Sequence, residues 1–264
     1  MMKHFFLLLT LWVVAVSAGA KDRLVVAKAP DGVELKHDFE VRARIIGGPW
    51  QPVDTYMMMV DSARHNAVKT SVAKFEMEGT VEVEVTSKQA DIRSYRIRPL
   101  SKGIKAVQTG RTLRFTLDRP RYLSVEINGD IYHNLQLFAD RVMDKPKVRK
   151  RDLIYFGPGV HDLKGDSLAI PSGKTVFIDQ GAVIKGWLSV YRASNVKIMG
   201  HGIVMPGRHE GIMVRYAKNV SVDGPLTTQL PVGGSDSVTV KNAKEMSWNG
   251  WGDGFNVFAS NNVS

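Results

Sequence analysis

The sequence predicts an all-β protein, with an N-terminal antiparallel β-sandwich followed by a right-handed parallel β-helix. Hydrophobic and polar residues alternate repeatedly between residues 24 and 139, with no helical stretch of three turns. A short valine-containing phrase then recurs through the C-terminal half. We place a signal peptide at 1–20, the sandwich at 21–147 and the β-helix at 148–264.

Residues 1–20 have the organisation of a signal peptide. Lys3 and His4 precede an apolar run over residues 5–16, and Ala18-Gly19-Ala20 supplies the small residues that signal peptidase requires. The run is shorter than the roughly 20 residues that span a bilayer, which favours cleavage over the alternative, a retained membrane anchor. We therefore expect a secreted or periplasmic protein without a membrane span after cleavage.

The cysteine content and the net charge limit which chemistry and which binding partners are plausible for this protein. The chain has no cysteine, which excludes disulfides, a thiolate nucleophile and a lipidated N-terminal cysteine. Its formal charge of +10 is compatible with nucleic acid, an anionic membrane or an acidic polysaccharide. The densest basic cluster, residues 145–151, lies in the predicted linker, where solvated charges are ordinary. Because no RNA-binding or helix-turn-helix motif accompanies this cluster, nucleic acid is disfavoured.

The sandwich prediction depends on period-two alternation. Phe39, Val41, Ala43 and Ile45 alternate with charged residues, as expected for a strand with one solvated face. The same pattern recurs at 81–85, 113–117 and 123–127. The last segment precedes Asn128-Gly129, a turn pair typical of hairpins. At least six such strands predict an antiparallel sandwich of roughly 120 residues.

The β-helix prediction depends on a repeat in which a small or polar residue precedes valine, a polar residue and an aliphatic residue. It occurs at 195–198, 219–222 and 237–240, begins again at 262–264, and has a possible earlier member at 175–178. Each unit is too short to bury a face alone, so stacking as coils is the economical solution. Glycines fall where coils must turn, at Gly181, Gly186, Gly200, Gly202 and Gly224. A second sandwich and a leucine-rich repeat are the alternatives, although the leucine-asparagine signature of the latter is missing.

Several segments resemble known glycoside hydrolases. Residues 183–186 and 195–204 are similar to the opening coils of the polygalacturonase-like enzymes of family 28. Residues 124–129 and 134–139, leading into 155–159, resemble family 49, the dextranases and isopullulanases. The resemblance covers nearly all of the mature chain. It implies a secreted enzyme that cleaves a polysaccharide, either an α-glucan or a pectin-like polymer, and a chain that ends before the active site is complete.

Asp253 is the catalytic residue that this resemblance implies. In the polygalacturonase-like clan, a stretch similar to residues 251–257 reads Asn-Thr-Asp-Gly and its aspartate is catalytic, whereas Trp251 and Gly252 replace the first two residues here. Inverting hydrolysis needs an acid and a base about 6.5 to 9.5 Å apart. The family places the partner, an Asp-Asp pair, about one coil further on, beyond Ser264. The alternative for Asp253 is a turn residue, since Asp-Gly is a common turn dipeptide.

The remaining candidates concern binding. Trp248 and Trp251 suit stacking on sugar rings, or equally the filling of a coil end, and we assign Asn256 to substrate binding with them. His201, His209 and Glu210 fit no standard zinc or calcium motif, so we expect solvated loop residues, no metal and no cofactor. Two alternatives to a hydrolase stay open. They are a polysaccharide lyase, for which residues 151–264 show no calcium-type acidic cluster, and a non-catalytic binding protein.

Overall fold

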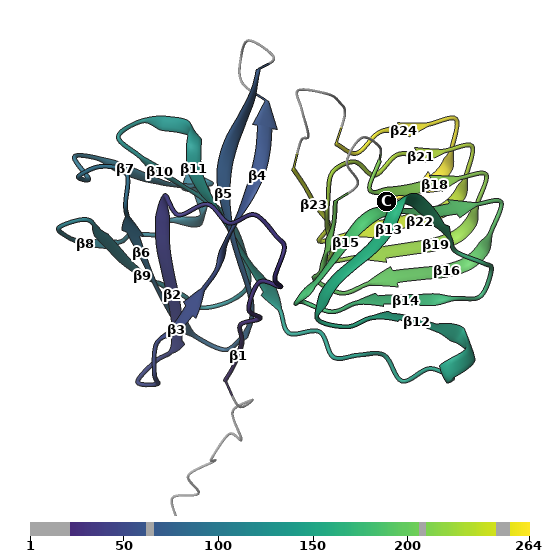
Figure 1. Cartoon of the computed structure of the whole chain (residues 1–264), viewed down its shortest axis with the longest axis horizontal. Helices are drawn as coiled ribbons and strands as arrows, with labels where there is room; N and C mark the ends of the chain where they lie inside the picture. Colours follow the sequence, from purple (N-terminus) through teal and green to yellow (C-terminus); the bar gives the residue numbers. More distant parts are fainter. Residues whose placement is uncertain (1–21, 62–65, 206–209, 247–253) are drawn as a thin grey trace, which may run out of the picture.

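The structure, a computed structural model, describes residues 22–61, 66–205, 210–246 and 254–264. Two β-rich regions lie side by side, an N-terminal pair of packed sheets and a C-terminal stack of parallel strands (Figure 1). The predicted all-β fold, a sandwich followed by a parallel β-helix, is confirmed. In the described ranges the helices are two short 3-10 turns, η1 (Leu100–Lys102) and η2 (Lys150–Asp152). Neither is long or apolar enough to cross a membrane.

The sandwich has two sheets. One contains β1 (Arg23–Val25), β4 (Thr55–Asp61), β5 (Ala67–Glu78), β7 (Tyr95–Arg98), β10 (Arg121–Ile127) and β11 (Asp130–Arg141). The other contains β2 (Phe39–Ile45), β3 (Gln51–Val53), β6 (Val81–Ser87), β8 (Val107–Thr109) and β9 (Thr112–Leu117). All described pairs are antiparallel except β5–β11, which is parallel.

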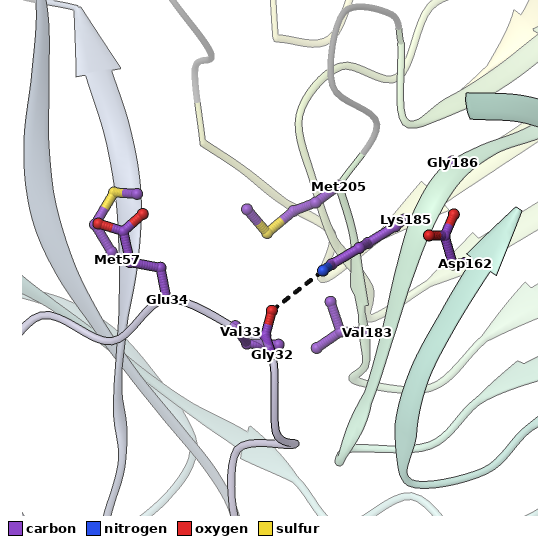
Figure 2. A pocket seen from close by; sticks show the side chains of 9 residues that line it. All are labelled: Gly32, Val33, Glu34, Met57, Asp162, Val183, Lys185, Gly186 and Met205. Atoms are coloured by element: carbon purple, nitrogen blue, oxygen red, sulfur yellow. Dashed lines mark hydrogen bonds between the residues drawn. The ribbon is translucent and has the colours of Figure 1, made fainter. Parts of the chain in front are cut away.

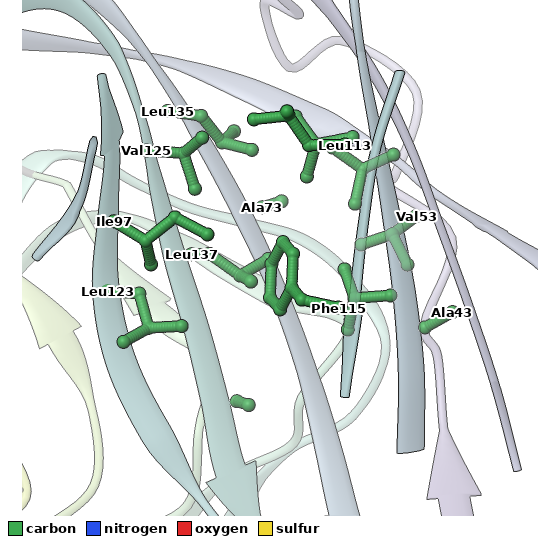
Figure 3. Close-up of a cluster of buried hydrophobic side chains, with 14 of the residues drawn as sticks. Ala43, Val53, Ala73, Ile97, Leu113, Phe115, Leu123, Val125, Leu135 and Leu137 are labelled. Carbon is green, nitrogen blue, oxygen red and sulfur yellow. The ribbon is translucent and has the colours of Figure 1, made fainter. Parts of the chain in front are cut away.

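The space between the two sheets is a hydrophobic core, part of which Figure 3 shows. The alternating residues Val81, Val83 and Val85 all point into it, as the sequence predicts. Asn128 and Gly129 form the two-residue turn between β10 and β11, with φ angles of 54° and 82°. Positive φ at both positions is what a type I′ hairpin turn requires, which explains this residue pair.

Strands β5 and β11 are buried on both faces along most of their length. One face of each, including Phe75 and Leu137, contributes to the sandwich core. On the opposite face, Val72 and Phe138 pack with Val183 of the β-helix. Both faces are covered because this sheet is the middle layer between the second sandwich sheet and the β-helix.

The β-helix contains two parallel sheets. The first has the order β12 (Leu153–Phe156), β14 (Thr175–Ile178), β16 (Ser194–Met199), β19 (Lys218–Asp223), β22 (Asp236–Lys241) and β25 (Asn261–Val263). The second is built on β15 (Ala182–Tyr191), which pairs along its length with β13 (Gly159–Ala169). The opposite edge of β15 starts two separate ladders of parallel strands. The first half of β15 pairs with β17 (Ile203–Val204), which is followed by β20 (Leu226–Thr227) and β23 (Lys244–Glu245). The second half of β15 begins the ladder β18 (Ile212–Arg215), β21 (Val232–Gly233) and β24 (Val257–Phe258).

The repeat read from the sequence sets the register of the first sheet. Val196, Val220, Val238 and Val263 are successive partners across β16, β19, β22 and β25. The possible earlier member of the repeat, residues 175–178, also lies in this sheet, but in a shifted register. Val176 lies opposite Ile198 rather than Val196. A shift of two residues keeps the same side chains on the inner face, so the core continues through it.

Each coil turns sharply just before the recurring valine. Asn195, Asn219, Ser237 and Asn262, which begin the repeat, all have φ between 51° and 58°. Asparagine tolerates this left-handed conformation better than most residues, which explains its recurrence. Asn219 also donates a 2.7 Å hydrogen bond from Nδ2 to Oδ1 of Asn195 on the preceding coil. Gly200 reflects close approach instead, since a Cβ there would lie 2.1 Å from the Ile178 carbonyl oxygen.

Candidate functional site

The candidate site is the outer face of the ladder formed by β18, β21 and β24 with the second half of β15. Inner side chains such as Leu188, Val214 and Val232 are fully buried. Backbone hydrogen bonds continue the ladder beyond the named strands, because Leu230 N donates to Gly254 O at 2.9 Å. The residues between the inner ones face outward, and they include Met213, Arg215, Gln229 and Asn256.

Asp253, Trp248 and Trp251 lie outside the described residues, so their predicted roles stay predictions. The chain that follows Asp253 is hydrogen-bonded to the preceding coil. Gly254 accepts the hydrogen bond from Leu230, and the carbonyl of Asn256 accepts one of 2.8 Å from Val232 N. Asn256 itself is exposed on the outer face. Residues 254–258 therefore form the next rung of this sheet, and Asp253 is joined directly to its first residue.

Glu245 is a carboxyl group that the sequence analysis missed. It ends β23 in register with Thr227 one coil earlier, and an added Cβ on Gly254 would lie 2.7 Å from its Oε2. Burial raises the pKa of Glu245 to about 7. Among the described residues its buried Oε1 has no hydrogen-bond partner. A carboxyl group that keeps its proton near neutral pH can donate it, which is the task of a general acid. No motif marks Glu245 in the sequence, because it meets Gly254 only where β23 and β24 of the same coil come together at a corner.

A second polar pair lies on the candidate face. Arg215 Nη2 donates to Glu210 Oε1 at 3.2 Å, across the end of the loop that precedes β18. Glu210 is therefore half-buried and paired, rather than solvated as expected. His209 lies outside the described residues. The Glu210–Arg215 pair gives the candidate face a partly exposed guanidinium.

A cavity of about 450 Å³ lies between the sandwich and the first half of β15 (Figure 2). Apolar side chains, among them Val33, Met57 and Met205, line it together with three charged ones. The amine of Lys185 donates to the Gly32 carbonyl at 3.1 Å, while the side chain of Glu34 turns outward to pair with Lys69 at 2.9 Å. Lys185 and Glu34 thus bond to separate partners rather than converging on a common point in the cavity.

His201 lies far from solvent, and the expectation of an exposed loop residue is wrong. Its ring is 1% exposed, and Nδ1 lies 2.6 Å from Oε1 of Glu76 on the sandwich. Nε2 lies 3.6 Å from Oδ1 of Asp140. A Cβ on Gly224 would lie 2.5 Å from the histidine ring, so this glycine is needed for the ring to fit. His201 is thus part of the contact between the two regions.

Two lysines complete this buried charged network. Lys244 Nζ lies 2.7 Å and 2.9 Å from the two carboxylate oxygens of Asp140, and it also donates to the Gly224 carbonyl at 2.6 Å. Lys74 reaches from β5 to the Gln180 carbonyl of the β-helix. Burial lowers the pKa of Lys244, and it lowers the pKa of Lys74 to about 8. Within the described ranges no group of three or more His, Asp or Glu side chains could hold a metal ion.

Fold and exposed face define the class: a parallel β-helix protein with an N-terminal β-sandwich. Among solved structures, Dex49A from Penicillium minioluteum is similar with a TM-score of 0.60 and 14% sequence identity. The match covers 83% of this chain and 60% of that chain, so the present chain spans less than two thirds of Dex49A. The similarity establishes a shared fold.

A second structure, the "putative glycosyl hydrolase" of Parabacteroides merdae, matches with a TM-score of 0.37 and 14% identity. That match covers 42% of this chain and 66% of the other, and it adds nothing to the assignment of the fold. No protein-family model and no curated protein matches the sequence.

Proposed function

We propose that the protein is a secreted glycoside hydrolase that cleaves a polysaccharide with inversion, and that Asp253 is one of its water-activating carboxylates. The observation that carries the proposal is the position of residues 254–258 as a rung of an exposed parallel sheet. The aspartate that precedes such a rung is joined to a surface long enough to hold several sugar units. The fold shared with Dex49A is consistent with this reading.

The geometry of stacked coils suits a two-carboxylate mechanism. In an inverting reaction one carboxyl group protonates the leaving oxygen, while a second activates water on the opposite face of the sugar. The two must stand about 6.5 to 9.5 Å apart to leave room for that water. Adjacent rungs are separated by about 4.8 Å, so side chains from neighbouring coils can reach this separation. We assign the base, the group that activates the water, to Asp253.

The test is Asp253→Asn in the complete gene product, assayed by reducing-sugar release from α-glucans and polygalacturonate per folded molecule. The amide keeps the size of the side chain but cannot take a proton from water, so turnover should fall about 10²- to 10⁴-fold. Asp236→Asn is the matched control, because Asp236 lies on the other sheet, where its Oδ1 accepts a 2.8 Å hydrogen bond from Asn262. The control should retain nearly full turnover.

Three outcomes would contradict the proposal. Retention of more than about a third of the turnover by Asp253→Asn would remove Asp253 from catalysis, since losing a base costs far more. Release of unsaturated sugars by the wild-type protein would identify a lyase instead. Binding without any cleavage of these glycans would indicate a non-catalytic protein.

A further inference from the structure

Three aromatic side chains stand exposed along one corner of the β-helix. Tyr191 and Phe258 end β15 and β24, and Tyr216 directly follows β18; their exposed fractions are 48%, 42% and 61%. Tyr191 and Tyr216 contact each other edge to face, with ring centroids 5.7 Å apart. We call this set, together with Arg192 and Arg215, the aromatic stripe. Large apolar groups aligned on three of four stacked coils are unusual at a solvated turn.

Two of these rings pack against glycines at the end of β21, the strand between β18 and β24. A Cβ on Gly234 would lie 2.8 Å from carbons of the Tyr216 ring. A Cβ on Gly233 would lie 2.2 Å from the Phe258 ring. Any side chain at either position would displace a ring, so each ring packs against the backbone on one side. The remaining surface of each ring is then left to solvent.

Cationic groups are interleaved with the rings. The Arg192 guanidinium lies 5.3 Å from the centre of the Tyr191 ring, and that of Arg215 lies 5.6 Å from the centre of the Phe258 ring. Arg215 is partly neutralised by Glu210, whereas Arg192 makes no ion pair within the described part of the chain. The aromatic stripe therefore combines apolar faces with net positive charge.

We propose that the aromatic stripe binds a polysaccharide chain that carries carboxylate groups, such as a polyuronate. The C–H faces of pyranose rings stack on aromatic rings, and a guanidinium pairs with carboxylate through two parallel hydrogen bonds. The distance from Tyr191 to Phe258 is three coil steps, about 14 Å at the spacing of stacked strands, which covers a few sugar units. Charge complementarity selects this ligand over a neutral glucan, because Arg192 has no ion-pair partner among the described residues.

This binding is separate from bond cleavage, so it does not depend on Asp253. The stripe reaches only Phe258, at the end of the rung formed by residues 254–258. A glycan held there can be retained by the protein even when no bond is cut. The failure of the hydrolase proposal and the failure of this one are therefore distinguishable.

The experiment measures affinity for polygalacturonate and for dextran by affinity electrophoresis, using the complete Asp253→Asn protein so that no substrate is consumed. Tyr191→Ala combined with Tyr216→Ala should weaken polygalacturonate binding about tenfold or more, since each aromatic contact accounts for a several-fold factor. Arg192→Gln should weaken polygalacturonate binding and reduce its sensitivity to salt. Tyr155→Ala is the matched control, because Tyr155 is 42% exposed and stacks on Phe177 elsewhere on the β-helix.

Polygalacturonate binding that is lost in the double variant and retained in the control, with unchanged melting of both, supports the proposal. Equal binding by the double variant and the control would overturn the stripe as a glycan site. Dextran bound as tightly as polygalacturonate, with no effect of Arg192→Gln on either, would overturn the anionic ligand.

Discussion

The β-helix is held by two kinds of contact, and they differ in chemistry. Its inner core consists of stacked aliphatic side chains such as Ile198, Val220 and Val238. Its contact with the sandwich instead contains the buried charged network of Lys74, Glu76, Asp140, His201 and Lys244, each less than 7% exposed. Apolar burial stabilises any close packing, whereas buried charges are tolerated only opposite their partners. The difference indicates that the core supplies stability and that the network fixes how the two regions dock.

The largest expected effect is at Asp140. Asp140→Ala leaves Lys244 buried with a backbone carbonyl as its remaining partner, which should cost about 3–5 kcal/mol in urea unfolding. Ile198→Val, the control in the apolar core, should cost about 0.5–1.5 kcal/mol. Asp140→Leu combined with Lys244→Met should recover much of the loss, because no charge is then left unpaired. If Asp140→Ala costs no more than Ile198→Val, the network does not determine the docking.

A smaller effect is expected from pH through Lys74. Its pKa is lowered to about 8 in the folded protein by burial, against an ordinary value of 10.5. Between these two values the unfolded chain holds more protons, so the contribution of Lys74 to stability rises with pH, by about 1–3 kcal/mol in total. Below pH 8 both states are charged and the dependence disappears. The contribution of Lys74 is measured by comparing the unfolding free energies of wild type and Lys74→Met at pH 8 and pH 10. If the two proteins show the same pH dependence, Lys74 is not its source.

The smallest expected effect concerns the coil corners. Asn219→Val places a β-branched residue at φ 53° and removes the hydrogen bond to Asn195, which should cost about 1–2 kcal/mol. Asn219→Gly keeps the backbone conformation accessible and should cost a few tenths of a kcal/mol. Thermal unfolding compares the two directly. An equal loss for glycine and valine would mean that the side-chain hydrogen bond, rather than the backbone conformation, maintains the corner.

The sequence predicted those features that repeat locally. The valine phrase gave the register of four coils, and Asn128-Gly129 gave the hairpin, because each depends on backbone preferences within a few residues. The docking network was not predictable in this way. Glu76 and His201 are 125 residues apart in sequence, and nothing near either marks the other as its partner. The second buried face of β5 was equally unpredictable, because it packs against β-helix residues that are distant in sequence, such as Val183.

The candidate site likewise contains residues that the local sequence predicts and residues that only the fold brings together. Asp253 was reached through a short resemblance, whereas the place of Asn256 on an exposed rung follows only from hydrogen bonds to the preceding coil. Glu245 meets Gly254, nine positions further on, across a corner of its own coil. The ring contact between Tyr191 and Tyr216 joins two coils and spans 25 positions, so no local pattern contains either contact.

The continuous strand β15 has a consequence for how such proteins can diversify. In its coil the two ladders of the second sheet share one strand, which bends at Gly186, where φ is 142°. In later coils the two ladders belong to separate strands, β17 and β18, then β20 and β21, then β23 and β24, with 7, 4 and 11 residues between them. Segments of quite different length are thus accommodated at one point while both ladders keep their register. New segments can be exchanged there coil by coil, so the surface at this corner can change without a redesign of the scaffold.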